Sequence, residues 1–295
     1  QTLTGGKLCL GTVKIGVPSY GYSTTIDPDK CNTLLPAATE IGITCFDTSP
    51  RYKDSERIIG NFVKNNKKKL FVSTKIDNLD ICDEFVVSKM RESIFESIEN
   101  LGHVDLYYLH QNEISVISNN HILESIRQLK NEGLIKEVGA SIYSMDELDF
   151  ILESNSFDWV QIPVNILDVS FYNRIIESNS TIKIAVRSIF LQGIIFHPEM
   201  IIESISDANE MISLLNKVKS LGSQYDLELI DLSVAYICSL PLIDQVLVGT
   251  TNIRNLKRIE RASRILLNTN IKSAIGEIAS TNKSWTNPRL WNKYI

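Results

Sequence analysis

Short apolar runs alternate along this chain with longer stretches in which apolar positions recur every three or four residues. The short runs are rich in β-branched and aromatic residues, which predicts β-strands. Strands are expected at residues 8–12, 43–46, 70–74, 104–109, 136–141, 159–163, 182–186 and 246–248. The longer stretches predict helices, which are expected at residues 29–41, 55–65, 83–101, 122–132, from Ser144 onward, 208–221, 229–238 and 253–262.

Eight strand–helix units in roughly 250 residues match a single (β/α)₈ barrel with a C-terminal helix and tail. No linker rich in Pro, Gly or Ser divides the chain, so we expect residues 1–295 to form one barrel domain. A doubly wound parallel sheet is the alternative. No GxGxxG motif follows the first predicted strand, so a bound dinucleotide is not expected to be held as in a Rossmann fold.

The composition is that of an ordinary globular protein, with 295 residues, 43% of them hydrophobic, and a net charge of −5. Such a chain is not expected to bind nucleic acid, and no apolar run reaches the roughly 18 residues of a membrane span. The N-terminal residues lack a signal-peptide core. The five cysteines are widely spaced, and no motif suggests a metal site, so we expect free thiols and a cytoplasmic location.

Polar side chains end three successive predicted strands. Asp47, Lys75 and His110 follow the second, third and fourth strands, and Tyr52 lies in the loop after Asp47. Because the carboxyl ends of parallel strands share one edge, where α/β enzymes keep their sites, we expect the four side chains to converge. Each has a structural explanation when taken alone, such as a helix cap for Asp47. Together they predict an active site.

These residues resemble the pattern of the aldo-keto reductases, which are barrel enzymes that bind a nicotinamide dinucleotide across their C-terminal face. The family's Asp-Thr-Ala, Tyr and Ser-Glu signature matches the stretch from Asp47 to Glu56, and its Lys and His fall on Lys75 and His110. The likeness continues through Gly139–Ser141, Gln161, Arg187–Ser188 and Gly249–Thr251. The resemblance implies an NAD(P)H-dependent oxidoreductase.

The resemblance also implies a role for each of the four residues when the nicotinamide supplies a hydride. Tyr52 is expected to give the proton to a carbonyl oxygen. An unperturbed phenol has a pKa of about 10, and Lys75 is expected to lower the pKa of Tyr52 by stabilising the phenolate. Asp47 is expected to pair with Lys75, and His110 to hydrogen-bond the substrate oxygen.

A cofactor site is implied along the later strands, where helix starts and loops offer N–H donors. Contacts to the nicotinamide and the pyrophosphate are expected from Ser141, Gln161, Arg187, Ser188, Gly193, Gly249, Thr250 and Thr251. Arg254, Lys257 and Arg258 stand where a ribose 2′-phosphate would lie, which favours NADP(H) over NAD(H). A solvated basic helix face explains these three cations equally well.

Four positions depart from the family's usual residues. Lys53 stands where glycine commonly follows the tyrosine, and Ile142 and Ile259 replace asparagines. Arg187 replaces an aromatic residue that often stacks on the nicotinamide, although a guanidinium plane can also stack. Further candidates for the pocket wall are Tyr20, Tyr22, Tyr143, Phe190, His197 and Trp285.

The sequence therefore predicts an NADP(H)-dependent reductase of an aldehyde, a ketone or a sugar derivative. Residues 187–193 and 287–291 look like a bacterial branch of the family associated with surface-polysaccharide gene clusters. Cations at Arg51, Lys53 and Arg187 favour a polar or anionic substrate, such as a sugar or nucleotide sugar. The alternatives are a cofactor-binding regulatory subunit with little turnover and a lyase that forms a Schiff base on the strand-three lysine.

Overall fold

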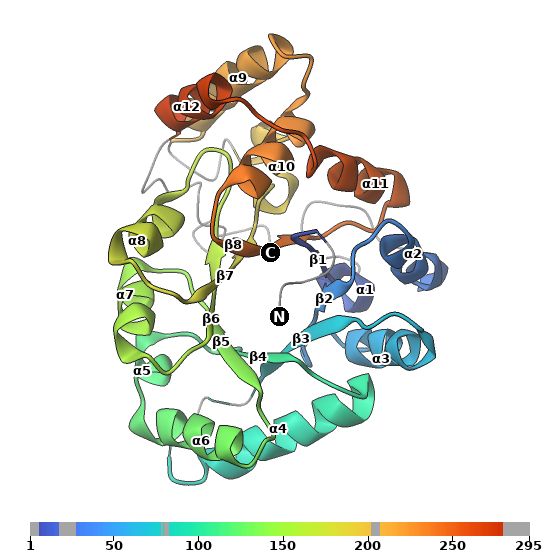
Figure 1. Ribbon diagram of the computed structural model, residues 1–295, viewed down its shortest axis with the longest axis vertical. Coiled ribbons are helices and arrows are strands. Elements are labelled where there is room, and N and C mark those ends of the chain that lie inside the picture. Colours follow the sequence, from blue (N-terminus) through green and yellow to red (C-terminus); the bar gives the residue numbers. More distant parts are fainter. Residues whose placement is uncertain (1–5, 18–27, 78, 80–82, 202–206, 280–295) are drawn as a thin grey trace.

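The chain folds into eight parallel strands closed into a barrel (Figure 1). The computed structural model describes residues 6–17, 28–77, 79, 83–201 and 207–279. The strands are β1 (Leu8–Gly11), β2 (Cys45–Asp47), β3 (Phe71–Ile76), β4 (Leu106–Leu109), β5 (Glu137–Ser141), β6 (Trp159–Pro163), β7 (Lys183–Arg187) and β8 (Ile243–Val248). They follow one another in chain order, and β8 pairs with β1. The predicted (β/α)₈ barrel is confirmed, and the closed order excludes a doubly wound sheet.

Helices surround this barrel on the outside (Figure 1). They are α1 (Val13–Gly16), α2 (Pro28–Glu40), α3 (Ser55–Asn65), α4 (Val86–Leu101), α5 (Ile114–Ile117), α6 (Asn120–Asn131), α7 (Met145–Ser154), α8 (Ser170–Ser178), α9 (Ala208–Ser223), α10 (Leu229–Ser239), α11 (Ile253–Ala262) and α12 (Thr269–Ile278). Two short 3₁₀ helices, η1 (Leu191–Gly193) and η2 (Pro198–Ile201), follow β7. The sequence did not predict α1, α5, α8 or α12. Of these, α1 and α5 have four residues each, too few to show a helical period.

Side-chain caps explain where several helices begin. Ser144 and Glu147 form the predicted capping box at the start of α7. Asn119 and Asn252 accept hydrogen bonds from the first free N–H groups of α6 and α11. Gly133, two residues after α6, has a φ of 75°, a conformation that favours glycine, as the sequence predicted for this helix end.

Side chains fill the barrel interior. Because residues alternate between the two faces of a strand, one face packs against the helices and the other points inward. Leu106, Tyr108, Trp159 and Ala185 form a small buried cluster that is separate from the large core under the helices. The barrel is therefore a packed core, and its binding surface lies at the strand ends.

A buried carboxylate joins the helices next to β3. Glu56 is only 2% exposed. Thr74 in β3 donates to Glu56 Oε1 over 2.6 Å, and Ser97 in α4 donates to the same oxygen over 2.9 Å. These charge-assisted hydrogen bonds fix the start of α3 against β3 and α4. They also fix the loop that precedes α3.

The described cysteines are free thiols. Cys9 and Cys45 face each other on β1 and β2, and the Cys45 thiol donates to Cys9 Sγ over 2.8 Å. Cys238 is half-buried. The side chain of Cys31 and the whole of Cys82 lie outside the described residues.

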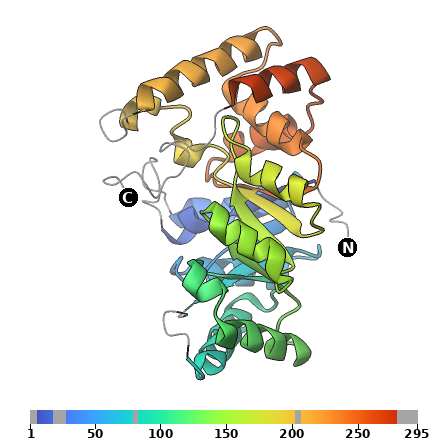
Figure 2. The same cartoon turned by 90° about the vertical axis from the view of Figure 1, so that its left-hand side faces the viewer.

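Two of the helices after β7 form an additional outer layer. Helices α9 and α12 lie side by side beyond α10 (Figures 1 and 2). In the part of the chain that the structure describes, no helix has both the length and the apolar character needed to cross a membrane.

Candidate active site

Asp47 and Lys75 form a buried ion pair at the C-terminal edge of the barrel. Lys75 Nζ lies 2.9 Å from Asp47 Oδ2, and the two side chains are 8% and 6% exposed. Lys75 also donates to the Thr48 carbonyl over 2.8 Å, and Ser73 donates to Asp47 Oδ1 over 2.9 Å. Neighbouring strands place these groups together, because Asp47 pairs with Ser73 across β2 and β3. The predicted Asp47–Lys75 pair is present.

The ammonium of Lys75 is held in its charged form. Burial alone lowers the pKa of Lys75, but the charge of Asp47, with that of Tyr52 and the Asp47 hydrogen bond, raises it above the ordinary value. An amine must lose its proton to attack a carbonyl, so this environment opposes Schiff-base formation at neutral pH. The lyase alternative therefore finds no support in the geometry of Lys75.

Hydroxyl groups anchor the loop that carries Tyr52. Thr48 donates to Ser55 Oγ over 2.9 Å, Ser55 donates to Thr12 Oγ1 over 2.9 Å, and Thr12 donates to a main-chain carbonyl of β2 over 2.8 Å. Gly16 lies against the backbone of Tyr52, where a Cβ atom would come within 1.5 Å of the Tyr52 carbonyl oxygen. The position of Tyr52 is thus set by β1, α1 and α3 together.

Tyr52 lies beside the ion pair, with Lys75 Nζ 5.3 Å from the centre of its ring. Burial raises the pKa of Tyr52, and the charges of Lys75 and Arg187, which lower it, do not outweigh burial. The prediction that Lys75 brings the pKa of Tyr52 below its usual value was therefore wrong in its net direction. The phenol keeps its proton at neutral pH because its surroundings are too dry to favour a phenolate.

His110 directly follows β4 and is half-buried. Its Nδ1 lies 3.2 Å from Ser49 Oγ, in the loop that carries Tyr52. The structure thus brings His110 to the same strand-end edge as Asp47, Tyr52 and Lys75, as the sequence predicted.

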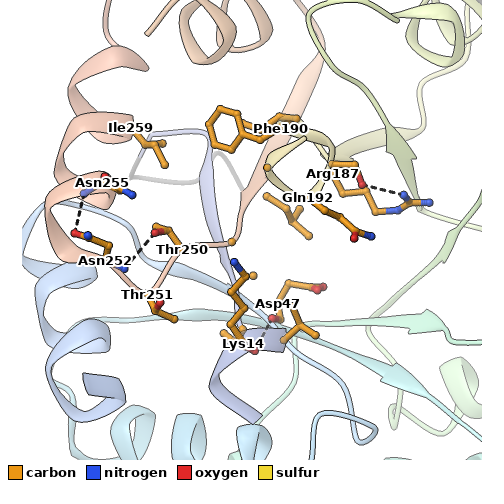
Figure 3. A pocket seen from close by; sticks show the side chains of 18 of the residues that line it. Lys14, Asp47, Arg187, Phe190, Gln192, Thr250, Thr251, Asn252, Asn255 and Ile259 are labelled. Atoms are coloured by element: carbon orange, nitrogen blue, oxygen red, sulfur yellow. Dashed lines mark hydrogen bonds between the residues drawn. The ribbon is translucent and has the colours of Figure 1, made fainter. Parts of the chain in front are cut away.

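A large cavity opens beside Tyr52, with a volume of about 1040 Å³. This is at the upper end of the usual range for ligand pockets. Arg187, Phe190 and Gln192 lie on one side of it and Thr250, Asn252 and Asn255 on the other, with Lys14 and Asp47 between them (Figure 3). Predicted cofactor residues among its lining are Gln161, Arg187, Ser188, Gly193, Gly249, Thr250, Thr251 and Arg254. Lys75 and Ser141 contact the lining residues Asp47 and Gln161, but neither they nor His110 line the cavity.

The loop after β7 has an unusual backbone. Ser188, Leu191 and Gln192 have φ angles of 61°, 46° and 57°, and Gly193 has a φ of 99°. Left-handed torsion angles are costly for residues with a Cβ atom, and they cluster at functional sites. Left-handed turns can present N–H groups that bind anions; in this loop the N–H groups of Leu191 and Gly193 already donate to the Ser188 and Phe190 carbonyls, so an anion would meet the remaining ones. This geometry fits the predicted contact of residues 188–193 with a pyrophosphate.

Ser141, Gln161 and Arg187 form one hydrogen-bonded group. Arg187 Nε donates to Ser141 Oγ over 3.2 Å, and Ser141 donates to Gln161 Oε1 over 3.0 Å. The Gln161 amide nitrogen is buried at the cavity wall without a well-formed hydrogen bond, although the Tyr108 hydroxyl lies near Gln161. A buried donor without an acceptor is costly, so this nitrogen fits a ligand carbonyl such as that of a carboxamide.

The three cations predicted for a 2′-phosphate lie in different places. Arg254 is exposed and lines the cavity. Arg258 donates to both carboxylate oxygens of Asp231 over 2.9 and 2.6 Å and lies 2.9 Å from Glu228 Oε2. Neither Arg258 nor Lys257 lines the cavity. Of the three, the structure brings only Arg254 to it.

Two cations predicted at the pocket mouth lie elsewhere. Arg51 forms a two-bond ion pair with Asp77, at 2.7 and 2.6 Å. Lys53 is exposed and outside the cavity lining, and its φ of 48° explains why glycine suits this position. The positive charges that do line the cavity are Lys14, Arg187 and Arg254. Sequence reasoning missed Lys14, because nothing marks a lysine after a first strand as functional.

Other candidates for the pocket wall are partly accounted for. Phe190 and His197 line the cavity. The ring centre of Tyr143 lies 3.8 Å from Arg187 Cζ. Tyr20, Tyr22, Trp285 and the tail 287–291 lie outside the described residues. In the described part of the chain, no group of three or more His, Cys, Asp or Glu side chains is arranged to hold a metal ion.

The cavity suits a nicotinamide dinucleotide in three respects. It is large, its left-handed loop suits a pyrophosphate, and its buried Gln161 donor suits a carboxamide. Ile142 and Ile259 stand where the sequence pattern led us to compare them with asparagines. Both side chains are buried and apolar, so neither offers a polar contact to a dinucleotide.

Curated relatives align with part of the chain. The methylglyoxal reductase DkgA of Escherichia coli O157:H7 is 30% identical over 129 residues, which are 41% of this chain and 43% of that protein. The D-arabinose 1-dehydrogenase of Saccharomyces cerevisiae is 32% identical over 132 residues, which are 41% of this chain and 38% of that protein. The chain thus spans about two fifths of the length of these relatives.

The fold also matches a solved structure over most of its length. The glycerol dehydrogenase of Gluconobacter oxydans superposes with a TM-score of 0.72 over 93% of this chain and 91% of that chain, at 18% identity. The family model described as the aldo/keto reductase family matches residues 7–280, a range that includes Asp47, Tyr52, Lys75 and His110. With the Asp47, Tyr52, Lys75 and His110 arrangement in place on a closed barrel, this chain belongs to the aldo/keto reductase family.

Proposed function

We propose that this protein is an NADPH-dependent carbonyl reductase in which Tyr52 is the general acid. The observation that carries the proposal is the position of Tyr52, which lines a large cavity and lies against the buried Asp47–Lys75 ion pair. A proton donor and a fixed positive charge at one end of a dinucleotide-sized cavity are what the reduction of a carbonyl needs.

The bound cofactor supplies the hydride. Tyr52 gives its phenol proton to the carbonyl oxygen, on which negative charge develops as the hydride arrives at the carbon. The ammonium of Lys75 stabilises the phenolate left on Tyr52, and Asp47 holds that ammonium in place. His110 donates a hydrogen bond to the same carbonyl oxygen and orients it towards Tyr52.

The raised pKa of Tyr52 suits the reducing direction. A general acid must hold its proton before the reaction, and burial keeps the phenol protonated at neutral pH. Oxidation of an alcohol needs the phenolate of Tyr52 at the start, so that direction requires higher pH.

The cofactor contacts follow from the cavity wall. Gln161 Nε2 donates to the carboxamide, the backbone of residues 188–193 with Thr250 and Thr251 binds the pyrophosphate, and Arg254 pairs with the ribose 2′-phosphate. The preference for NADPH over NADH rests on Arg254, because Arg258 already pairs with two carboxylates.

We further propose that the substrate is a sugar or a sugar derivative. The cavity lining combines apolar side chains such as Phe190 and Phe196 with the cations Lys14, Arg187 and Arg254. Residues 187–193 resemble the branch of the family associated with surface-polysaccharide gene clusters, and the names of two similar proteins refer to arabinose and glycerol.

Binding and turnover of the cofactor test the function. The purified protein is titrated with NADPH and with NADH while nicotinamide fluorescence is recorded. Loss of NADPH absorbance is then followed with matched neutral and acidic aldehydes, ketones and sugars. We expect micromolar or tighter binding of NADPH and turnover of at least one hydroxylated carbonyl. Tight binding without turnover of any carbonyl would instead support a regulatory subunit, and no binding of either cofactor would contradict the proposal.

A further inference from the structure

The guanidinium of Arg187 is held in place by neutral groups. Nε donates to Ser141 Oγ over 3.2 Å, Nη1 to Ser188 Oγ over 3.4 Å and Nη2 to the Ile142 carbonyl over 2.6 Å. Its plane lies on the ring of Tyr143, with Arg187 Cζ 3.8 Å from the ring centre. Three directed bonds and a stacked ring leave the guanidinium little freedom to turn towards a ligand.

No carboxylate compensates this charge among the residues that the structure describes, since none lies within 4.0 Å of the guanidinium. The other rigid cations near the strand ends differ in this respect. Lys75 is paired with Asp47, Arg51 with Asp77 and Arg258 with Asp231. Arg187 therefore carries a net positive charge at the cavity wall.

The charge of Arg187 reaches the reacting end of the cavity. Arg187 and Tyr52 both line the cavity, and the guanidinium is close enough to act on the ionisation of the Tyr52 phenol. A guanidinium keeps its proton at every pH at which a protein is folded. Any group that reacts beside Tyr52 consequently feels a constant positive potential.

We propose that Arg187 makes this cavity discriminate between the two redox states of the cofactor, so that NADPH binds more tightly than NADP⁺. The inference rests on the proposed function. The two forms share the same phosphates and ribose groups and differ in the ring, which is neutral when reduced and positive when oxidised. Arg187 repels the oxidised ring and leaves the reduced ring unaffected, because like charges at a fixed distance in a partly dry site cost energy.

Arg187 acts here as a fixed charge and not as a ligand. Its Nε and one N–H of each terminal nitrogen already bond to protein oxygens, which holds the guanidinium in place at the cavity wall. The consequence for turnover is that NADP⁺ leaves readily and inhibits weakly as a product. This suits a protein that works as a reductase.

The test is the ratio of two dissociation constants, Kd for NADP⁺ divided by Kd for NADPH, measured by fluorescence and calorimetry without substrate. In the wild-type protein we expect a ratio well above one. Arg187→Met, which keeps the length of the side chain and removes its charge, should lower the ratio on the order of tenfold. Arg187→Lys keeps a charge and should keep most of the ratio.

Arg254→Ala is the matched control, because Arg254 lines the same cavity and follows Thr250–Asn252 in the chain. Thr250 and Asn252 lie across the cavity from Arg187 (Figure 3). It should weaken both forms and leave the ratio within about twofold of the wild-type value. An unchanged ratio in Arg187→Met would overturn the inference while leaving the proposed function standing.

The wild-type protein alone also decides the matter, should Arg187→Met fail to fold. Equal affinity for the two forms, or tighter binding of NADP⁺, would contradict the role of Arg187. Binding of neither form would overturn the proposed function itself, so the two failures are distinguishable.

Discussion

Two regions of the strand-end face differ in construction. At the ends of β2 and β3, polar side chains form an ion pair and hydrogen bonds with one another. In the loop after β7, the unusual feature is the backbone, whose φ angles are positive at several residues. The Asp47–Lys75 pair is dry and is held by Ser73 and the Thr48 carbonyl. The loop after β7 instead combines four positive φ angles from Ser188 to Gly193. We call the first region the catalytic edge, made of Asp47, Tyr52, Lys75 and His110, and the second the cofactor loop, residues 188–193.

The difference reflects what each region has to bind. In the proposed function the catalytic edge holds charges in fixed positions relative to a small reacting group, which suits its strands and its buried ion pair. In the same proposal the cofactor loop offers backbone N–H groups to phosphates, which suits its left-handed torsion angles. A charge change should therefore damage the catalytic edge most, and a backbone change should damage the cofactor loop most.

The largest effect is expected from Lys75→Met. It leaves the Asp47 carboxylate buried without its partner, which should cost about 3–5 kcal/mol in the free energy of unfolding. Turnover should fall at least about 100-fold, because the phenolate of Tyr52 loses its stabilising charge. Urea denaturation and steady-state kinetics measure the two effects.

The double variant Asp47→Asn with Lys75→Met is the control for Lys75→Met. It removes both charges and should recover most of the lost stability but none of the lost turnover. Equal stability of the single and double variants would show that the ion pair is not what holds the catalytic edge.

The pH profile gives the next effect. The pKa of Tyr52 is raised by burial, with further raising effects of Asp47 and Tyr143 and against the lowering effects of Lys75 and, last, of Arg187. The acid form is active in reduction, so kcat/KM for the carbonyl should stay level through neutral and mildly alkaline pH. It should fall only at pH values above the ordinary pKa of a phenol, by tenfold per pH unit. An alkaline limb near pH 8 that is absent in Tyr52→Phe would mean that the phenol is more acidic than its burial implies.

Two arginines on α11 allow a smaller, paired test of cofactor choice. Arg254→Ala should reduce the preference for NADPH over NADH by roughly tenfold, because a charge-assisted bond to the 2′-phosphate is lost. Arg258→Ala should leave that preference unchanged and cost about 1 kcal/mol of stability, since Arg258 pairs with Asp231 and Glu228. Calorimetric Kd values for NADPH and NADH show which arginine sets the preference. A loss of preference in Arg258→Ala alone would assign the contact with the 2′-phosphate to Arg258 instead of Arg254.

The smallest effect is expected from a substitution of Lys53, which alters the backbone next to Tyr52 and removes no side chain from the cavity. Its φ of 48° is costly for lysine and free for glycine, so Lys53→Gly should raise stability by at most about 1 kcal/mol. Because the side chain is exposed and outside the cavity, kcat/KM for an anionic carbonyl should change less than about twofold. A marked loss for the anionic substrate alone would restore Lys53 as a substrate contact.

Strand ends were predictable because the register of a parallel barrel fixes them. Asp47, Lys75 and His110 each come at the end of an apolar run, and the parallel pairing of β2, β3 and β4 places these ends at the same edge of the barrel. Helix α3 was predicted at its observed bounds, Ser55–Asn65, for a different reason. It shows a clear apolar period and begins directly after the loop that carries Tyr52.

Long charged side chains were not predictable, because each reaches several partners. Arg51 and Arg258 form ion pairs with Asp77 and Asp231, which are distant from them in the sequence. The net direction of the Tyr52 pKa shift also escaped prediction, because it depends on the balance between burial and the Lys75 charge. A sequence pattern predicts which groups lie near one another, but it does not predict how far the site is buried from water.

The central claim is that Tyr52 supplies the proton in carbonyl reduction, and Tyr52→Phe tests it most directly. The variant keeps the ring and removes only the hydroxyl. NADPH affinity, measured by fluorescence titration, should stay within about threefold of wild type, because the phenol faces the substrate. Turnover of the best carbonyl from the panel should fall by about 10²–10⁴-fold. Near-normal turnover in Tyr52→Phe with intact NADPH binding would remove Tyr52 from the mechanism.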